Sequence, residues 1–342
     1  MMSTRLVDPR RPRTRDRPCG LAAVCVIVAM LGRQSANANE KAEQMATRAL
    51  VLGGGGPVGI AWETGLAFGL AEGRIDVGQA DFIMGTSAGS AVGAQLALGR
   101  KPGDMAASIR HQTSGQSQRA RNDPVQTAPT ADLTPLMGFM TRLHSGDGGA
   151  DDVRREIGKF ALAAKTIDEE AYIGTFGRMV GEAAWPSKRY LCTAVDTADG
   201  SFATWDNDSG VPLGRAVASS CAVPGIYPPI TINGKRYMDG GMRSGTNADL
   251  AKDYERVIVV AVRAGTAAQR ATPMAEAGRK RLEGEMDVIR AAGGQVELIV
   301  PDDEAVGILG VNLMDFRQRE PALDTGIRQG RAEAARLKAF WG

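Results

Sequence analysis

The strongest constraint on the fold of this sequence is a repeated order of short apolar run, glycine turn and helix. Ala49–Leu52 has the length and composition of a buried strand, and the four glycines Gly53–Gly56 follow it directly. Pro57 fits the first turn of a helix that we expect to end near Glu72. A strand, a tight turn and a helix in this order are typical of the units that build a parallel sheet.

The same order occurs a second time. Phe82–Met84 predicts another short buried strand, and the Ala-, Leu- and Val-rich stretch Ala88–Leu98 predicts a buried helix. Successive units of this kind assemble into a mainly parallel sheet through right-handed crossovers. We therefore expect an α/β fold.

Further strands and helices are expected downstream, and they complete one α/β domain over residues 45–342. The expected strands are Tyr190–Val195, Phe202–Trp205, Arg236–Met238, Val257–Val262 and Gln295–Val300. The expected helices are Leu213–Cys221, which ends at Pro224-Gly225, and Pro321–Trp341.

An insert at about residues 101–186 interrupts this order. Gln112–Asp132 is polar and predicts a long surface loop, whereas Asp151–Ala164 and Asp168–Ala184 predict helices. The insert either covers the functional site as a lid or forms peripheral helices. Six apolar residues in the insert share one helical face. Three roles are open for this face: packing on a core, covering the site, or contact with a membrane. The six residues are Leu133, Leu136, Met137, Phe139, Met140 and Leu143.

Residues 1–44 resemble a leader. Arg5–Arg17 is strongly basic, Leu21–Leu31 is apolar, and Ala36-Asn37-Ala38 resembles a signal-peptidase site. The apolar run is too short to anchor stably in a bilayer. Two alternatives stay open: the leader over residues 1–38 directs export or envelope association, or translation begins at Met45 and the protein is cytoplasmic.

The charge of the remaining chain argues against a nucleic-acid partner. Residues 1–44 hold eight Lys/Arg and four Asp/Glu, which leaves 33 basic and 35 acidic side chains. A body that is nearly neutral has no global field to attract nucleic acid. Aromatic residues make up only 5% of the chain, too few for a platform on which bases stack.

Cysteine usage predicts neither a disulfide framework nor a metal site. Cys19 and Cys25 lie in the leader-like segment, and we expect Cys192 and Cys221 to be two small buried thiols. No Cys-x-x-Cys and no Cys/His ligand spacing is present, so we expect no metal.

The candidate nucleophile lies in Gly85-Thr86-Ser87-Ala88-Gly89, which matches the pattern G-x-S-x-G. The pattern alone is weak in a glycine-rich chain. Here it follows an expected strand and opens an expected helix, as the sharp turn of a nucleophile elbow requires. The N-terminal end of that helix would favour anionic species beside Ser87.

A second glycine pattern, Gly54-x-Gly56-x-x-Gly59, permits two interpretations. It fits a dinucleotide-binding fingerprint, so a nicotinamide- or flavin-dependent oxidoreductase is a rival function. That function also needs an acidic residue at the end of the second strand, and the nearest candidates are poorly placed: Glu72, Asp76 and Asp81. The other interpretation is that the backbone N–H groups of Gly54, Gly55 and Gly56 form an oxyanion hole.

The candidate base is Asp239, in Asp239-Gly240-Gly241 directly after an expected strand. The chain has only two histidines, His111 and His144, and both lie in or beside the insert rather than at a strand end. A carboxylate must then accept the serine proton, and burial can raise its pKa enough for this. The same tripeptide occurs at Asp147, but no expected strand precedes it, and we reject it.

In this order, the three motifs resemble those of the patatin-like phospholipase family. The resemblance extends from about Arg48 to Leu250, and Ala222–Pro229 is similar to the family's segment before the catalytic Asp. It implies a three-layer α/β/α fold and a Ser87–Asp239 dyad without metal or organic cofactor. It also implies hydrolysis of acyl esters of phospholipids, lysophospholipids or neutral lipids, with transient contact to a membrane surface.

Two departures from the family pattern stand out. Many members carry Arg or Lys where this chain has Val58, so a cation that could help an oxyanion or a phosphate head group is missing. This favours the broader activity of an esterase. The second departure is Asn247-Ala248-Asp249, which lacks the proline of the family's Asn-x-Pro element. An inactive lipid-binding scaffold and an acyltransferase remain alternatives, and the sequence carries no signal for an oligomeric state.

Overall fold

A central sheet of eight strands organises the part of the chain that the structure describes. The structure is a computed structural model, and it describes residues 47–114, 132–181, 184–264 and 273–342. The strand order is β5-β6-β3-β2-β1-β7-β8, with β4 paired to β3. The bounds are β1 Arg48–Leu52, β2 Phe82–Gly85, β3 Arg189–Asp196, β4 Phe202–Trp205, β5 Ile230–Ile232, β6 Lys235–Asp239, β7 Arg256–Val260 and β8 Gln295–Ile299.

The sheet is mainly parallel, as predicted. Strands β3, β2, β1, β7 and β8 run parallel to one another. Strands β4 and β6 pair antiparallel with β3, and β5 pairs antiparallel with β6. In the register, Leu52 is paired with Gly85 on one side and Val260 on the other. The glycine turn, the nucleophile motif and the segment after β7 therefore leave the sheet at the same edge.

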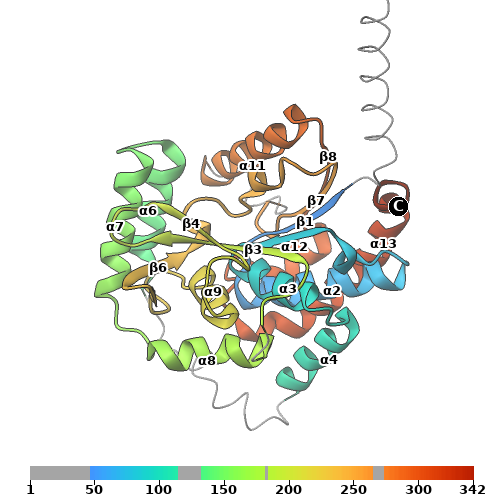
Figure 1. Ribbon diagram of the computed structural model, residues 1–342, viewed down its shortest axis with the longest axis horizontal. Helices are drawn as coiled ribbons and strands as arrows, with labels where there is room; N and C mark the ends of the chain where they lie inside the picture. The colour runs from blue at the N-terminus through green and yellow to red at the C-terminus, as the bar shows by residue number, and fades with distance from the viewer. Residues whose placement is uncertain (1–46, 115–131, 182–183, 265–272) are drawn as a thin grey trace, which may run out of the picture. The chain divides into compact units, whose positions relative to one another are not determined.

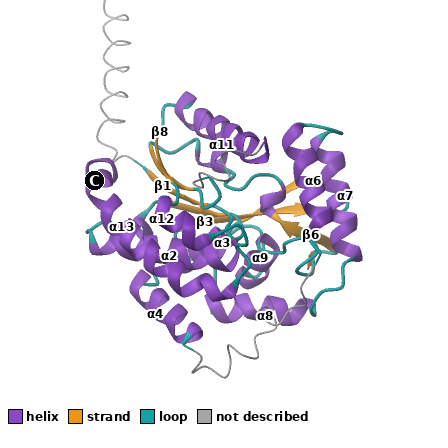
Figure 2. Cartoon of the chain, turned by 180° about the vertical axis from the view of Figure 1, so that it is seen from behind, coloured by secondary structure: helices purple, strands orange, loops and turns teal. Residues whose placement is uncertain are grey.

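Helices cover both faces of the sheet, so the predicted three-layer α/β/α arrangement is confirmed (Figures 1 and 2). The longer helices are α2 Gly56–Glu72, α3 Ala88–Ala97, α4 Pro102–Thr113, α6 Thr134–Ser145, α7 Ala150–Ala163, α8 Glu169–Val180, α9 Leu213–Ser220, α11 Pro273–Ala291, α12 Asp303–Leu309 and α13 Arg319–Trp341. The short 3-10 turns are η1 Val77–Gln79, η2 Gly240–Met242, η3 Ala248–Ala251 and η4 Phe316–Gln318.

The layers follow from the alternation of side chains along each buried strand. On β1, Leu50 and Leu52 belong to the core that includes α2, α3 and α13. Ala49 and Val51 point to the other face, where a second core includes Met286 of α11. A strand buried on both faces has the continuous apolar sequence from which it was predicted.

Helix α13 lies along α2 in close contact. The glycines of the two helices face each other, and an added Cβ on Gly69 would lie 2.1 Å from the Ile327 carbonyl oxygen. The predicted C-terminal helix is thereby confirmed with a start two residues earlier than expected. Its packing brings the segment that precedes it next to the N-terminus of α2.

The predicted insert contains four described helices, α4, α6, α7 and α8. The apolar face of α6 packs with α7 against a third core that includes Val153, Val195 and Met238. Packing on a core is therefore the role of this face, although Met137 is 49% exposed. Most of the expected loop Gln112–Asp132 lies outside the described residues, as does the leader-like segment. In the described ranges, we find no helix that meets the length and hydropathy of a bilayer-spanning segment.

Candidate active site

Ser87 occupies a strained turn between β2 and α3. Its backbone angles are φ 52° and ψ −119°, a left-handed region that few residues other than glycine adopt. The motif glycines permit this turn because α3 lies against the strands. An added Cβ on Gly85 would lie 2.3 Å from the carbonyl carbon of Gly89, and one on Gly89 would lie 2.2 Å from the Leu52 oxygen.

Hydrogen bonds hold the backbone of Ser87 in place. Its N–H donates to the Ser220 Oγ at 3.0 Å. Its carbonyl oxygen accepts from the Ser90 Oγ at 2.7 Å and from the Cys221 Sγ at 3.1 Å. A backbone in such a region costs about 1–3 kcal/mol, and these contacts offset that cost.

Asp239 ends β6, and its side chain is only 3% exposed. The carboxylate accepts the Gly241 N–H at 2.7 Å and hydrogen-bonds with the side chain of Ser87. Burial raises the pKa of Asp239 from 3.8 to about 6, and the hydrogen bonds from Ser87 and Gly241 and the positive charge of Arg263 oppose that rise. The carboxyl group can therefore be ionised at neutral pH and still take up a proton.

The two glycines after Asp239 fit this turn for steric reasons. An added Cβ on Gly240 would lie 2.1 Å from the Thr193 Oγ1, and one on Gly241 would lie 2.9 Å from the Asp239 Oδ1. Glycine at the second position lets the carboxylate fold back over the Gly241 N–H, which fixes the direction in which the carboxylate points.

The glycine loop offers fewer free donors than the sequence suggested. The Gly54 N–H donates to the Gly245 carbonyl oxygen at 2.8 Å, and the Gly59 N–H donates to the Gly55 oxygen at 2.7 Å. Within the described ranges, the N–H groups of Gly55 and Gly56 make no hydrogen bond. Those two groups are the ones that can bind an anion.

Ala88 offers a third such donor at the helix N-terminus that we expected to favour anions beside Ser87, although the predicted oxyanion hole named only Gly54, Gly55 and Gly56. It is the first residue of α3, and in the described part of the chain its N–H also has no acceptor. A signal was present, because the first N–H groups of any helix lack a partner within the helix. Gly56, Ser87 and Ala88 line the same pocket.

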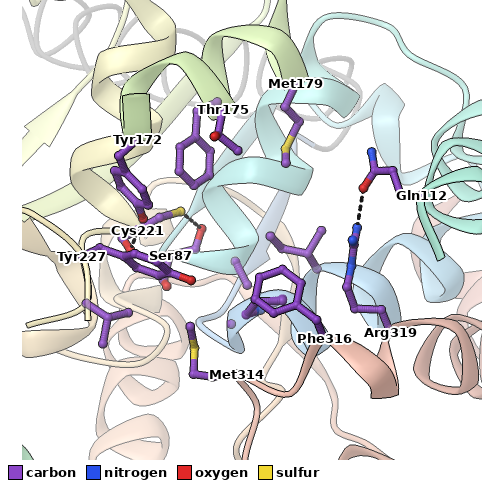
Figure 3. A pocket seen from close by; sticks show the side chains of 16 residues that line it. Ser87, Gln112, Tyr172, Thr175, Met179, Cys221, Tyr227, Met314, Phe316 and Arg319 are labelled. Atoms are coloured by element: carbon purple, nitrogen blue, oxygen red, sulfur yellow. Dashed lines mark hydrogen bonds between the residues drawn. The ribbon is translucent and has the colours of Figure 1, made fainter. Parts of the chain in front are cut away.

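That pocket is largely apolar, and segments far apart in the sequence form it (Figure 3). Pro57 and Ile60 come from α2, and Phe176 and Met179 come from α8 of the insert. Further residues come from α4, from the segment after α9 and from residues 314–319. A serine at the end of an apolar pocket suits a substrate with a hydrocarbon chain.

Asn247 connects the turn of Ser87 to the turn of Asp239. Its Nδ2 donates to the Thr86 Oγ1 at 2.9 Å and to the Gly240 oxygen at 3.4 Å, and its Oδ1 accepts from Arg243 at 2.8 Å. Asn247 has a φ of 53° and is fully buried. The loop keeps this link without the family's proline, and the sequence offered no sign of it beyond the asparagine itself.

Arg263 is a residue that sequence reasoning missed. It follows β7 at the sheet edge of the glycine loop, and its charge lowers the pKa of Asp239. Its neighbour Val262 touches that loop, since an added Cβ on Gly55 would lie 2.8 Å from the Val262 Cγ1. Arg263 is exposed as a residue, but burial of its guanidinium lowers the pKa of this group. A cation therefore lies near the site although Val58 supplies none.

Neither histidine lies at the site. His111 is exposed on α4, and the ring of His144 hydrogen-bonds with the Met140 carbonyl oxygen within α6. Neither lines the pocket that contains Ser87. Asp147, which we rejected as the candidate base, lies exposed in the turn between α6 and α7.

Cys192 and Cys221 are both buried and unpaired with each other, as predicted. Burial is the main cause that raises the pKa of the Cys221 thiol well above its usual value, so this thiol stays protonated beside Ser87. Among the described residues, no group of three or more His, Cys, Asp or Glu side chains is arranged to hold a metal ion.

Comparisons with known proteins agree with the motifs. The family model described as patatin-like phospholipase matches residues 50–252. VipD from Legionella pneumophila has a similar structure with 16% identity and a TM-score of 0.42, and the match covers 85% of this chain and 67% of VipD. The type III effector protein ExoU gives 16% identity and a TM-score of 0.37, with 85% of this chain and 53% of ExoU covered. No curated protein sequence matches this chain.

Proposed function

The chain belongs to the patatin-like phospholipase family, whose members are lipid acyl hydrolases, and on this premise we propose that it hydrolyses a carboxylic ester of a lipid through an acyl-enzyme on Ser87. The observation that carries the proposal is that Ser87, in its strained turn, faces the buried carboxylate of Asp239 closely enough for its hydroxyl to lower the pKa of that carboxyl. Strained backbone at a non-glycine residue is a hallmark of functional sites, because packing alone would select a relaxed residue there.

The first chemical step forms the acyl-enzyme. Asp239 accepts the proton of the Ser87 hydroxyl as the Oγ attacks the ester carbonyl carbon. The N–H groups of Gly55, Gly56 and Ala88 donate to the oxyanion of the tetrahedral intermediate. The intermediate collapses as the ester C–O bond breaks, and the protonated Asp239 gives its proton to the departing alcohol or lysolipid.

The second step releases the fatty acid. Asp239, ionised again, takes a proton from a water molecule as that water attacks the acyl carbonyl. The same N–H groups hold the second oxyanion, and Ser87 leaves with the proton from Asp239. A pKa of about 6 suits a group that must first accept and then donate a proton near neutral pH.

The geometry favours an ester over a dinucleotide as the ligand of the glycine loop. A dinucleotide places its pyrophosphate at the N-terminus of the helix that follows such a loop. Here the N–H of Val58, in the first turn of α2, donates to the Leu313 carbonyl oxygen at 3.2 Å. The Gly54 N–H is occupied as well. The loop therefore keeps the N–H groups of Gly55 and Gly56, a set of donors that suits one oxyanion better than a pyrophosphate.

The substrate class follows from the pocket and its surroundings. The apolar lining suits the acyl chain. The positive charge of Arg263 acts on Asp239, and near the reacting groups it would favour a substrate with an anionic head group. We therefore propose phospholipids and lysophospholipids beside neutral esters, with transient contact to the surface of the aggregated lipid.

Ester turnover by wild type, Ser87→Ala and Asp239→Asn tests this proposal, with Ser108→Ala and Asp147→Asn as matched controls on the exposed surface. The substrates are a p-nitrophenyl ester and a phosphatidylcholine vesicle. We expect Ser87→Ala and Asp239→Asn to lose turnover, and we expect the two control variants to keep the turnover of the wild type. Undiminished turnover in Ser87→Ala would overturn the mechanism. Ester formation with an added acceptor alcohol would instead assign an acyltransferase, and lipid binding without turnover a scaffold.

A further inference from the structure

One wall of the pocket comes from a segment that lies outside the residues matched by the family model. This segment, Leu313–Arg319, joins α12 to α13 and includes η4. Met314, Phe316 and Arg319 line the pocket. In Figure 3, Met179 of α8 lies at the top of the pocket and Met314 and Phe316 lie at the bottom. The segment is therefore one of two facing walls around the same space.

Hydrogen bonds fix this wall in position. The Leu313 carbonyl oxygen accepts the Val58 N–H at 3.2 Å, and the Leu313 side chain is buried in the main core. The Met314 N–H donates to the Asn312 Oδ1 at 3.1 Å, and the Asp315 N–H donates to the Asn312 carbonyl oxygen at 3.1 Å. A wall held in this way is preformed, so its side chains can select among substrates.

The wall touches the loop that holds the oxyanion donors. An added Cβ on Gly56 would lie 2.6 Å from the Leu313 carbonyl oxygen and 2.9 Å from the Met314 Sδ. Met314 thus lies beside the reacting end of the pocket. Phe316 follows two residues later and lines the pocket as well.

A polar pair lines the end of the pocket away from Ser87. The Arg319 guanidinium donates to the Gln112 Oε1 at 3.0 Å. Figure 3 shows this pair and Ser87 on opposite sides of the pocket, with Phe316 between them. The hydrogen bond is partly buried, because Arg319 is buried and Gln112 is exposed. A hydrocarbon chain gains nothing by displacing a hydrogen bond between polar groups. The pair is therefore a natural end for the space that an acyl chain can occupy.

We propose that Met314 and Phe316 set the length of the acyl chain that the pocket accepts, with the Gln112–Arg319 pair as its far end. This inference rests on the proposed acyl-ester substrate. Shortening Phe316 opens room between Ser87 and the polar pair, whereas enlarging Met314 fills room beside the reacting end. The two changes should shift the preferred chain length in opposite directions.

Binding of saturated fatty acids from C8 to C18 tests this without requiring turnover. Each acid displaces a fluorescent fatty acid from the Ser87→Ala protein, alone or with Phe316→Ala, Met314→Trp or Val311→Ala. Val311 lies in the same connection, is 84% exposed and does not line the pocket, so it is the control. We expect about fourfold tighter binding for each methylene that newly fits in Phe316→Ala. Met314→Trp should favour shorter acids, and Val311→Ala should match its parent.

The outcomes separate this inference from the proposed function. An unchanged ranking of chain lengths in both Phe316→Ala and Met314→Trp overturns the inference, whatever the hydrolysis assays give. A shifted ranking with no ester turnover by the wild type supports the acyl pocket and overturns the hydrolase. Thermal unfolding of each variant accompanies the assay, and Phe316→Leu replaces Phe316→Ala if the latter does not fold.

Discussion

Replacing the buried carboxyl of Asp239 should stabilise the folded protein at neutral pH. Burial raises the pKa of Asp239 from 3.8 to about 6, and each pKa unit corresponds to about 1.4 kcal/mol. The ionised carboxylate therefore costs the folded state about 3 kcal/mol relative to its protonated form. Asp239→Asn keeps the shape and an acceptor for the Gly241 N–H, and it removes the titration.

The sign of the pH dependence follows from linkage. A carboxyl whose pKa is higher in the folded state contributes full stability below its unfolded pKa, near 4, and loses that contribution as pH rises through about 6. The unfolding temperature of Asp239→Asn minus that of the wild type should therefore increase between pH 4 and pH 8. For a domain of this size, about 3 kcal/mol corresponds to about 5 °C.

Thermal unfolding followed by circular dichroism at several pH values measures this gain. Asp147→Asn is the matched control, because Asp147 is also followed by two glycines and lies exposed in a turn. The difference between its unfolding temperature and that of the wild type should not change with pH. If the difference in unfolding temperature between Asp239→Asn and the wild type is also constant, or falls as pH rises, then Asp239 is not a buried carboxyl with a raised pKa.

Three further substitutions probe the surroundings of the dyad. Arg263→Gln removes a charge that lowers the pKa of Asp239, so the pH midpoint of Ser87 reactivity should move upward; a downward shift would contradict this. Gly89→Ala should lower the free energy of unfolding by about 1–3 kcal/mol in chemical unfolding, because its Cβ would overlap a carbonyl group of β1. Gly138→Ala should not lower it, because the space around Gly138 is open. His144→Ala should keep ester turnover within about twofold, and a loss of turnover would replace the dyad by a triad.

The elements that bury continuous apolar runs could be predicted from the sequence. Strands β1, β2 and β7 and helices α2 and α3 occur within two residues of their predicted bounds, because apolar runs and glycine turns are local signals. Ser87 and Asp239 could be chosen for the same reason, since each follows an apolar strand. The antiparallel edge strand β5 and the helices α11 and α12 were not predicted, because their sequences lack an equally clear pattern.

The surroundings of the site depend on contacts that no local pattern encodes. Gly54 was predicted as an oxyanion donor, but its N–H donates to Gly245, which lies about 190 residues further along the chain. The nearness of Arg263 to Asp239 depends on the pairing of β7 with β1. Phe316 reaches the pocket because α13 packs along α2, and nothing in the sequence around Phe316 indicates this.

Activation of Ser87 by Asp239 can be measured through the pH dependence of covalent labelling. The second-order rate of modification of Ser87 by a fluorophosphonate probe is measured from pH 4.5 to pH 8.5 in wild type and Asp239→Asn. The wild-type rate should rise through about pH 6 to a plateau, and the variant should react slowly without that step. A wild-type rate that does not change across this range, or a variant that labels as fast as the wild type, would contradict this activation.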